Sequence, residues 1–570
     1  MTHDLVIRGG TLIDGTGLPR YVGDIGISGG RITKIGRIRE RGHQEVDADG
    51  LCVTPGFIDG HTHMDAQVSW DPLGTSSCWN GVTSVVMGNC GFTLAPCRAD
   101  QRPLVVRNLE RAEDIAAEAM AAGITWAWET FPEYLDQLDR LPKGINYAGY
   151  VGHSALRTYV MGERAFSEQA SEQDLASMAA ELRRSIEAGA IGFSTSRSSN
   201  HETSDDRPVA SRLASWEEVS HLVGVLGDLG AGIFELATEK NVRVADPARR
   251  AEFCQRLQRL AVDTRVPTTF GITIAGNETA DAWRDQLALL DTTAAAGGRM
   301  FGQSHCRDVT IVVSFQTSLP FDKLPGWRKL RALPLQEQAT ALRDPELRQR
   351  LVQEANHGNY GQALDSEGRK PKWDQVLVYD KPLPPYSTVA EVAARRGVDP
   401  VEAMIDLALE TNLEQRFLQT WPGVTAEGVL EILRHPRTIM TFSDTGAHVR
   451  LISDCSIHAH LLAYWVREMQ AFTLEEAVRM ITLAPATAWN FADRGLLREG
   501  FAADINVLDP ARLTPEMPVL VRDLPGSASR LIQKTSGIHA TIVNGQVLMR
   551  DGEHTGALPG RLLRGPLANH

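Results

Sequence analysis

Two histidines separated by one residue, His61 and His63, are the residues best suited to do chemistry in this sequence. They follow a short apolar run, residues 55–59, which has the composition of a strand. Because side chains alternate faces along a strand, both imidazoles should point the same way and could bind one metal ion. A lone His-x-His pair is weak evidence for a metal site, so other donors have to support it.

Two further donors, Cys90 and Asp444, occupy the same kind of position. Each follows an apolar, strand-like run, residues 83–87 and 438–442. Imidazole, thiolate and carboxylate ligands together favour zinc over magnesium or calcium. Zinc lowers the pKa of bound water from 15.7 to about 7, which supplies hydroxide at neutral pH. We therefore predict a metal-dependent hydrolase in which Asp444 serves as general acid and base.

The elements that must position these donors alternate between strand-like runs and helical stretches. This alternation is typical of a parallel sheet with crossover helices. Eight such units predict an α/β fold of the (β/α)8 TIM-barrel type, in which reactive side chains gather at the carboxyl ends of the strands. The predicted strands end near His63, Cys90, His153, Ser196, Glu235, Ile272, His305 and Asp444.

Both ends of the chain have a different texture, with short alternating runs and Gly-Gly and Asp-Gly turns that indicate hairpins. We expect residues 1–55 and 495–570 to form one small β-sandwich domain. Residues 56–310 and 396–494 would form the barrel. Residues 311–395 break the rhythm, and we interpret them as a lid-like insertion over the barrel mouth, with a surface elaboration or dimer contact as the alternative.

Composition limits the partners of the protein. The chain has 570 residues and 43% hydrophobic residues, enough for more than one domain. Its 58 basic and 71 acidic residues give a net charge of −13, which argues against nucleic acid or an anionic membrane and favours a small-molecule substrate. No apolar run approaches the roughly 20 residues of a membrane span, and residues 1–4 lack signal-peptide character, so we expect a cytoplasmic protein. The sequence leaves open whether it forms a homo-oligomer.

Taken together, these motifs resemble the amidohydrolase superfamily, and within it the D-aminoacylase group of N-acyl-D-amino-acid deacylases. The resemblance implies a barrel with a small β-sandwich and hydrolysis of amides at one or two zinc ions. It covers nearly the whole chain and is carried by residues 4–15, 55–65, 88–91, 150–157, 192–195 and 443–444.

The sequence departs from that group at two places. D-aminoacylases carry a histidine ligand on each of the fifth and sixth strands, whereas residues 232–239 and 268–273 contain no histidine. What remains favours a single zinc ion, held by the histidine pair and the aspartate. Cys90 would lie nearby or bind, and Glu235 or His305 could replace the missing ligands.

The second departure concerns substrate binding. The deacylases hold the substrate carboxylate with an arginine after the catalytic aspartate. Here Arg450 could take that role, or the substrate carries no free carboxylate. His153 and His448 are further candidates for substrate contact, whereas we expect His201 on a solvated loop.

These observations predict zinc-dependent hydrolysis of a linear, non-peptide C–N bond, in an N-acyl-D-amino acid or a related N-acyl compound. Two alternatives stay open. One is hydrolysis of a cyclic amide or imide, and the other is a non-hydrolytic isomerase, lyase or binding protein on the same scaffold. The identity and handedness of the substrate depend on loops that the sequence does not specify.

Overall fold

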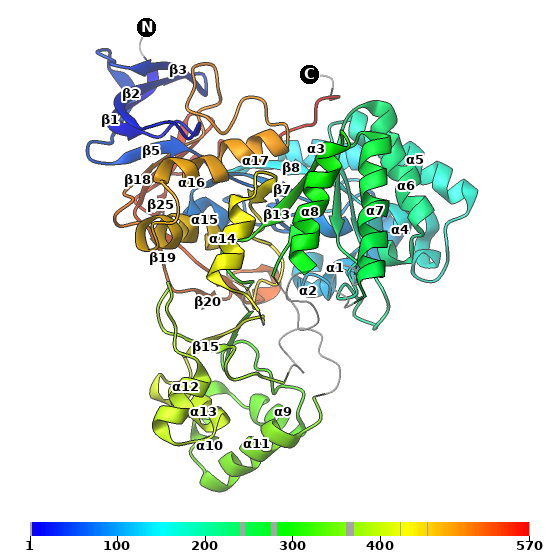
Figure 1. The fold of residues 1–570 in the computed structure, drawn as a ribbon, viewed down its shortest axis with the longest axis vertical. Helices are drawn as coiled ribbons and strands as arrows, with labels where there is room; N and C mark the ends of the chain where they lie inside the picture. The colour runs from blue at the N-terminus through cyan, green and yellow to red at the C-terminus, as the bar shows by residue number, and fades with distance from the viewer. Residues whose placement is uncertain are drawn as a thin grey trace.

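The computed structural model describes residues 3–239, 246–274, 282–309, 311–360, 370–421, 423–452 and 454–568. Figure 1 shows parallel strands flanked by helices, a β region at one side that contains the N-terminal strands, and a separate lobe below. Among the described residues, no helix is long and apolar enough to span a membrane.

The parallel strands form two sheets, one of six strands in the order β17-β13-β12-β11-β10-β9 and one of three in the order β6-β7-β8. They are almost entirely buried, as expected for strands covered on both faces. Their bounds are β6 Phe57–Asp59, β7 Val82–Met87, β8 Asn146–Gly149, β9 Val151–Gly152, β10 Gly192–Ser196, β11 Ile233–Ala237, β12 Thr268–Ile272, β13 Met300–Ser304 and β17 Thr438–Met440.

Amphipathic helices connect these strands and cover them. On one side α5, α6, α7 and α8 pack in sequence order (Figure 1). Ser171 and Asp174 form a capping box at the start of α5, and Thr473 and Glu476 form another at the start of α16. The bounds are α1 Arg102–Glu110, α2 Ala117–Gly123, α3 Phe131–Arg140, α4 His153–Met161, α5 Glu172–Glu187, α6 Trp216–Leu229, α7 Pro247–Thr264, α8 Ala282–Ala295, α14 Ala426–Arg434, α16 Leu474–Ile481 and α17 Leu483–Ala488.

The predicted parallel α/β architecture is confirmed, but the described strands do not close into one hydrogen-bonded barrel. Only Tyr150 separates β8 from β9, yet they belong to different sheets. Strands β6 and β17 have only three residues each, and the described residues show no ladder between them. One isolated bridge, between Thr62 and Thr445, joins the segments that follow them. The segments that follow them are nevertheless tied together, since the Asp444 N–H donates to the His61 carbonyl at 3.2 Å.

Strands from the two ends of the chain share one nine-stranded sheet, in the order β25-β24-β23-β18-β5-β1-β2-β3, with β4 paired to β1. The antiparallel pair β5 and β18 joins the two ends. Two packed layers, the β-sandwich of the sequence analysis, remain a prediction. The bounds are β1 His3–Leu12, β2 Tyr21–Ser28, β3 Arg31–Gly36, β4 Gly42–Asp47, β5 Cys52–Pro55, β18 Ile505–Leu508, β23 Ile538–Val543, β24 Gln546–Arg550 and β25 Glu553–His554.

The inserted segment forms its own lobe with its own core, which includes Phe321 and Trp327 (Figure 1). Strand β16 pairs with both β14 and β15, so this unit runs to residue 419, beyond the predicted end at 395. Its elements are β14 Ile311–Ser314, α9 Pro325–Arg331, α10 Leu335–Ala341, α11 Pro345–His357, β15 Val376–Tyr379, α12 Val389–Arg396, α13 Pro400–Glu410 and β16 Arg416–Gln419.

Candidate metal centre

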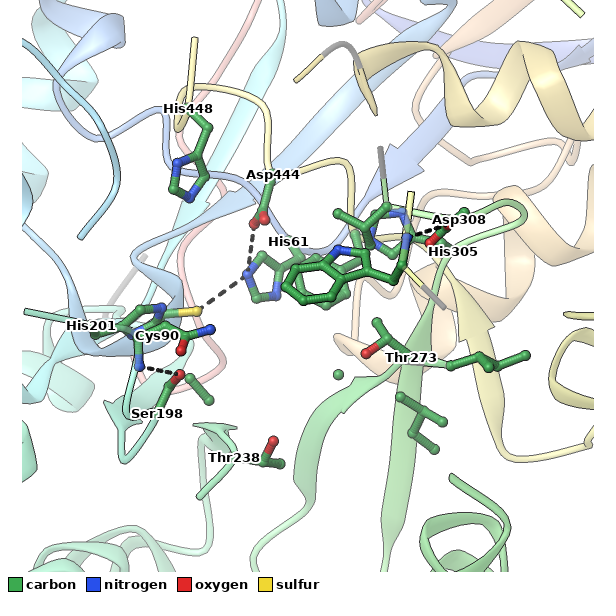
Figure 2. Close-up of a pocket in the computed structure, with 18 of the residues that line it drawn as sticks. His61, Cys90, Ser198, His201, Thr238, Thr273, His305, Asp308, Asp444 and His448 are labelled. Carbon is green, nitrogen blue, oxygen red and sulfur yellow. Dashed lines mark hydrogen bonds and ion pairs between the residues drawn. The ribbon is translucent and has the colours of Figure 1, made fainter. Parts of the chain in front are cut away.

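A cavity of about 540 Å³ opens at the carboxyl ends of the parallel strands (Figure 2). This is the end at which barrel-type α/β folds gather reactive side chains. The cavity collects every metal donor predicted from the sequence, together with Glu113 and His201, which were not predicted as donors. Its ionisable lining includes His61, His63, Cys90, Glu113, His201, Glu235, His305, Asp444 and His448.

The two histidines and the aspartate converge. Asp444 Oδ1 lies 3.2 Å from His61 Nε2 and 3.3 Å from His63 Nε2. This oxygen is buried, and it makes no hydrogen bond of good geometry with any of the described residues. Ligand distances of 2.0–2.2 Å in a tetrahedral zinc site imply that neighbouring donors lie about 3.3 Å apart. The spacing therefore fits three donors arranged around one ion.

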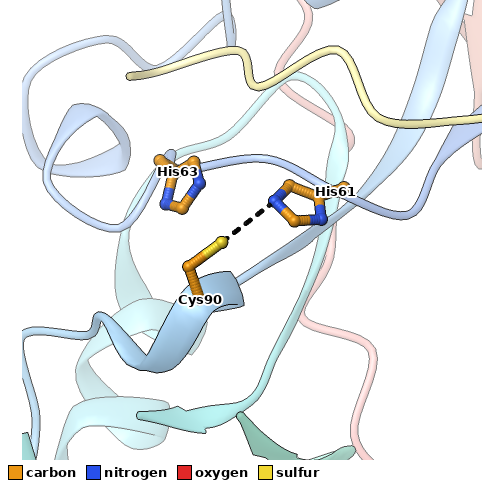
Figure 3. Close-up of side chains that lie close together, drawn as sticks. All are labelled: His61, His63 and Cys90. Atoms are coloured by element: carbon orange, nitrogen blue, oxygen red, sulfur yellow. Dashed lines mark hydrogen bonds between the residues drawn. The ribbon is translucent and has the colours of Figure 1, made fainter. Parts of the chain in front are cut away.

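Cys90 lies beside the histidine pair (Figure 3). Its Sγ is 3.5 Å from His61 Nε2, and the ligand atoms of His61, His63 and Cys90 all lie within 4.8 Å of one another. With a Zn–S distance of 2.3 Å, the corresponding tetrahedral spacing between sulfur and nitrogen is about 3.6 Å. The thiol therefore also fits the histidine pair as a ligand.

The chain holds Cys90 in an unusual backbone conformation. Its φ is 56°, and Gly88 and Gly91 on either side also have positive φ, a conformation that glycine adopts at little cost. The Cys90 N–H donates to Glu235 Oε2 at 2.8 Å, and the Gly91 N–H donates to Ser194 Oγ at 3.0 Å. These bonds fix the direction of the thiol.

Gln303, which the sequence analysis did not identify, sets the protonation of His61. The His61 Nδ1–H donates to Gln303 Oε1 at 2.6 Å, while Gln303 Nε2 donates to Thr269 Oγ1 at 3.2 Å. An amide oxygen can only accept, so this arrangement places the proton on Nδ1 and leaves the Nε2 lone pair facing the cavity. The only indication in the sequence is that Gln303 lies near the end of a predicted strand.

Charges in the cavity follow from burial and from the close contacts. Burial alone would raise the pKa of Asp444, but its contacts with the two histidines hold that pKa well below its usual value. Burial lowers the pKa of His61, yet Asp444 outweighs it and raises the pKa overall. Burial raises the pKa of Glu235 to about 7 and that of Cys90 well above 9. Deprotonation of the buried thiol thus requires a cation nearby.

Glu113 and His201 complete the cavity from outside the strands. Glu113, between α1 and α2, was not predicted. Its Oε2 lies 3.4 Å from His63 Nε2 and 4.0 Å from His448 Nε2. His201 lies on a loop, as expected, but it is half-buried: its ring lies 5.2 Å from that of Phe92 and lines the cavity. Burial lowers the pKa of His201 to about 3.

The other candidates from the sequence, for substrate contact or as replacement ligands, divide into two groups. Glu235, His305 and His448 line the cavity, and His305 packs its ring 4.8 Å from that of Phe442. Arg450 is exposed and lies outside the lining.

His153 is turned away from the cavity. It lies at the first residue of α4, and its ring contacts Thr195 Oγ1 at 2.8 Å and Glu218 Oε1 at 2.9 Å. Glu218 also binds the buried guanidinium of Arg157. These contacts indicate a role in packing and stability.

The inserted lobe supplies no described side chain to the cavity lining, so its function as a lid remains a prediction.

Comparison with known proteins agrees with this geometry. Residues 44–549 match the model of a family described as the amidohydrolase family. A D-aminoacylase of Alcaligenes xylosoxydans xylosoxydans is 28% identical, over 98% of this chain and 97% of its own length.

Solved structures share the fold. A D-aminoacylase with a binuclear metal centre has a TM-score of 0.66 at 24% identity, covering 99% of this chain and 100% of its own. An N-acyl-D-glutamate deacylase from Bordetella bronchiseptica, solved with zinc and a phosphonate that mimics the tetrahedral intermediate, gives 0.64 at 23%, with the same coverage.

Proposed function

This chain belongs to the amidohydrolase family, and we propose that it is a zinc-dependent hydrolase of a linear, non-peptide amide. The substrate would be an N-acyl-D-amino acid or a related N-acyl compound. The observation that carries the proposal is the convergence of His61, His63 and Asp444 at 3.2–3.3 Å, with Cys90 beside them. The activities named for the relatives, D-aminoacylase and N-acyl-D-glutamate deacylase, support the same chemistry.

His61, His63 and Asp444 would hold the ion, with Cys90 beside them, and would leave one position of a tetrahedral site for water. His61, His63, Asp444 and Cys90 offer two neutral imidazoles, a carboxylate and a thiol, which suits zinc. When bound, zinc lowers the pKa of water to about 7 and polarises the substrate carbonyl. We also infer that the two parallel sheets together correspond to the barrel of this family, since the segments after β6 and β17 are hydrogen-bonded to each other.

The remaining steps fall to side chains of the chain itself. Asp444 is ionised at neutral pH, so it can accept the proton of the attacking water and pass it to the departing amine. Gln303 holds the His61 ring in the orientation that presents Nε2. Apolar side chains of the lining provide a surface for an acyl group, namely Ile272, Ile274, Val424, Val429 and Ile432.

The test combines metal analysis with a substrate panel. Zinc-loaded protein should hydrolyse N-acyl amino acids of one or both hands, or related N-acyl amines, with incorporation of solvent oxygen into the released acid. Stoichiometric zinc without turnover of any amide or ester in the panel would overturn the proposal. Ring opening of hydantoins and imides, with indifference to linear amides, would replace it by the cyclic-amide alternative.

A further inference from the structure

We propose that the substrate is an N-acylated diamine, or a similar N-acyl amine with a second, positively charged nitrogen, and that Asp308 and His305 bind that nitrogen. The inference rests on the proposed function and deepens it, because it names the chemical class of the amine part. Hydrolysis of such an amide would release a carboxylic acid and a diamine. Both side chains follow β13 and line the cavity (Figure 2).

Asp308 supplies a carboxylate that forms no ion pair within the part of the chain that the structure describes. Its Oδ2 accepts the N–H of Trp421 at 3.0 Å, which holds the carboxylate at the wall of the cavity. The guanidinium of the neighbouring Arg307 donates to Asp454 instead, through Nη2 at 2.8 Å and Nε at 3.2 Å. Burial raises the pKa of Asp308 to about 8, as expected for a carboxyl group that lacks a paired cation.

His305 adds a hydrogen-bond acceptor to the same loop. It is 7% exposed, and neither ring nitrogen has a hydrogen-bond partner among the described residues. A buried polar group that lacks a protein partner usually meets a ligand, an ion or an ordered water. A neutral imidazole offers one lone pair and an ammonium group carries three N–H donors, so His305 and Asp308 can each accept one of them.

The other charges of the lining disfavour a carboxylate on the substrate. Among the lining residues that the structure describes, Arg307 is the only arginine or lysine, and it is paired with Asp454. Arg450, the predicted partner of a substrate carboxylate, is exposed and lies outside this lining. A carboxylate beside Asp308 would be repelled by a like charge, whereas an ammonium group would gain an ion pair.

The loop after β13 lies close to the metal donors. The ring of His305 lies 4.8 Å from that of Phe442, which in turn lies 4.0 Å from the ring of His61. One aromatic side chain therefore separates the cation site from the metal centre, a distance that a short methylene chain can span. Because the apolar lining is assigned to the acyl group, the charged nitrogen belongs to the amine part.

Three substrates of equal length would test the preference for charge. Each carries an N-acetyl group on a chain of four methylene groups, which ends in an ammonium, a methyl or a carboxylate group. At about pH 8.5 Asp308 is mostly ionised and a primary amine is still protonated. Zinc-loaded wild type should then prefer the ammonium compound over the methyl compound by about 10–100-fold in kcat/KM, the usual contribution of a hydrogen bond to a charged group.

Variants of the two residues separate charge from structure. Asp308→Asn keeps an oxygen for the Trp421 N–H but removes the charge, so it should lose the preference for the ammonium compound and hydrolyse the methyl compound like wild type. His305→Phe keeps a ring against Phe442 without an acceptor, and it should reduce the same preference. Asp374→Asn, on the exposed surface of the inserted lobe, removes one equivalent charge and should behave as wild type.

Similar kcat/KM values for all three compounds, or a preference for the carboxylate, would overturn the cation site and leave the proposed hydrolase standing. An Asp308→Asn protein that still prefers the ammonium compound would also overturn it, and a His305→Phe protein with the wild-type preference would remove His305 from the site.

Turnover of no amide at all would refute the proposed function, and calorimetric titration would then decide on the site. Zinc-loaded wild type should bind 1,4-diaminobutane more tightly than pentylamine, and Asp308→Asn should bind the two amines equally. Equal binding of both amines by the wild type would overturn the cation site as well.

Discussion

Replacement of Gln303 by methionine should weaken zinc binding although residue 303 never touches the ion. The amide oxygen of Gln303 accepts the Nδ1 proton of His61 at 2.6 Å and is fully buried. Methionine fills a similar volume but offers only a weak acceptor. Without that acceptor the imidazole loses both its fixed orientation and the preference for a lone pair on Nε2.

The size of the effect follows from the geometry. Loss of an outer partner of a ligating histidine usually costs 10–100-fold in metal affinity, which corresponds to about 1.4–2.8 kcal/mol. Because Gln303 is inaccessible to solvent, water cannot readily replace the lost acceptor. We therefore expect the upper part of that range, roughly 30–100-fold.

Competition with a chromophoric chelator would measure the zinc dissociation constant of each variant. Gln303→Glu is the matched control, because its carboxylate can accept from both His61 and Thr269 and should keep affinity close to wild type. Gln336→Met on the exposed surface of α10 controls for the methionine itself. A folded Gln303→Met protein that binds zinc like wild type would refute the assigned role of this hydrogen bond.

Three further predictions follow from the same contacts. Asp444→Asn should retain the fold but lower kcat by about 10²–10⁴-fold, the usual size of a lost acid–base step; near-normal steady-state activity would remove Asp444 from the mechanism. Glu235 has a pKa of about 7 in the folded protein, above the 4.5 of a free carboxyl, so its ionisation destabilises the fold increasingly as pH rises from 4.5 through 7. In metal-free protein, Glu235→Gln should add about 3 kcal/mol of stability at pH 8 and under about 1 kcal/mol at pH 5, by urea unfolding; an equal effect at both values would contradict the shift. Glu218→Gln should cost about 3–5 kcal/mol by leaving buried Arg157 without its carboxylate, with unchanged zinc affinity; weakened zinc binding would show that this cluster does reach the metal centre.

The sequence was most informative where strands position the site. His61, His63 and Asp444 each follow a short buried strand, and neighbouring parallel strands bring such positions together. This regularity made it possible to predict their convergence from residues almost 400 positions apart. Closure of the barrel could not be predicted in the same way, since it depends on how many residues of β6 and β17 remain extended.

Loops explain what the sequence did not indicate. Glu113 lies in a turn between two helices, and no periodicity relates it to His201. Their proximity depends on the ion pair between Arg111 and Glu202, which is a contact between side chains rather than a property of either segment. For His153 the strand-end position predicted a contact with substrate, but the ring does not line the cavity. It does lie after a strand, but a helix begins at that residue and turns the ring toward Glu218.

Residues at strand ends and residues on loops of this enzyme should differ in how well they tolerate substitutions around them. Groups at strand ends are fixed by the sheet and by buried partners such as Gln303, so their spacing matches an ion before it binds. Glu113 and His201 depend on ion pairs that are partly exposed, which are weaker and more easily rearranged. Arg111→Met should therefore loosen Glu113 and His201 and leave zinc affinity at the strand-end donors unchanged, as measured by competition with a chelator. Weaker zinc binding by a folded Arg111→Met protein would mean that the strand-end donors and the loop residues form one inseparable site.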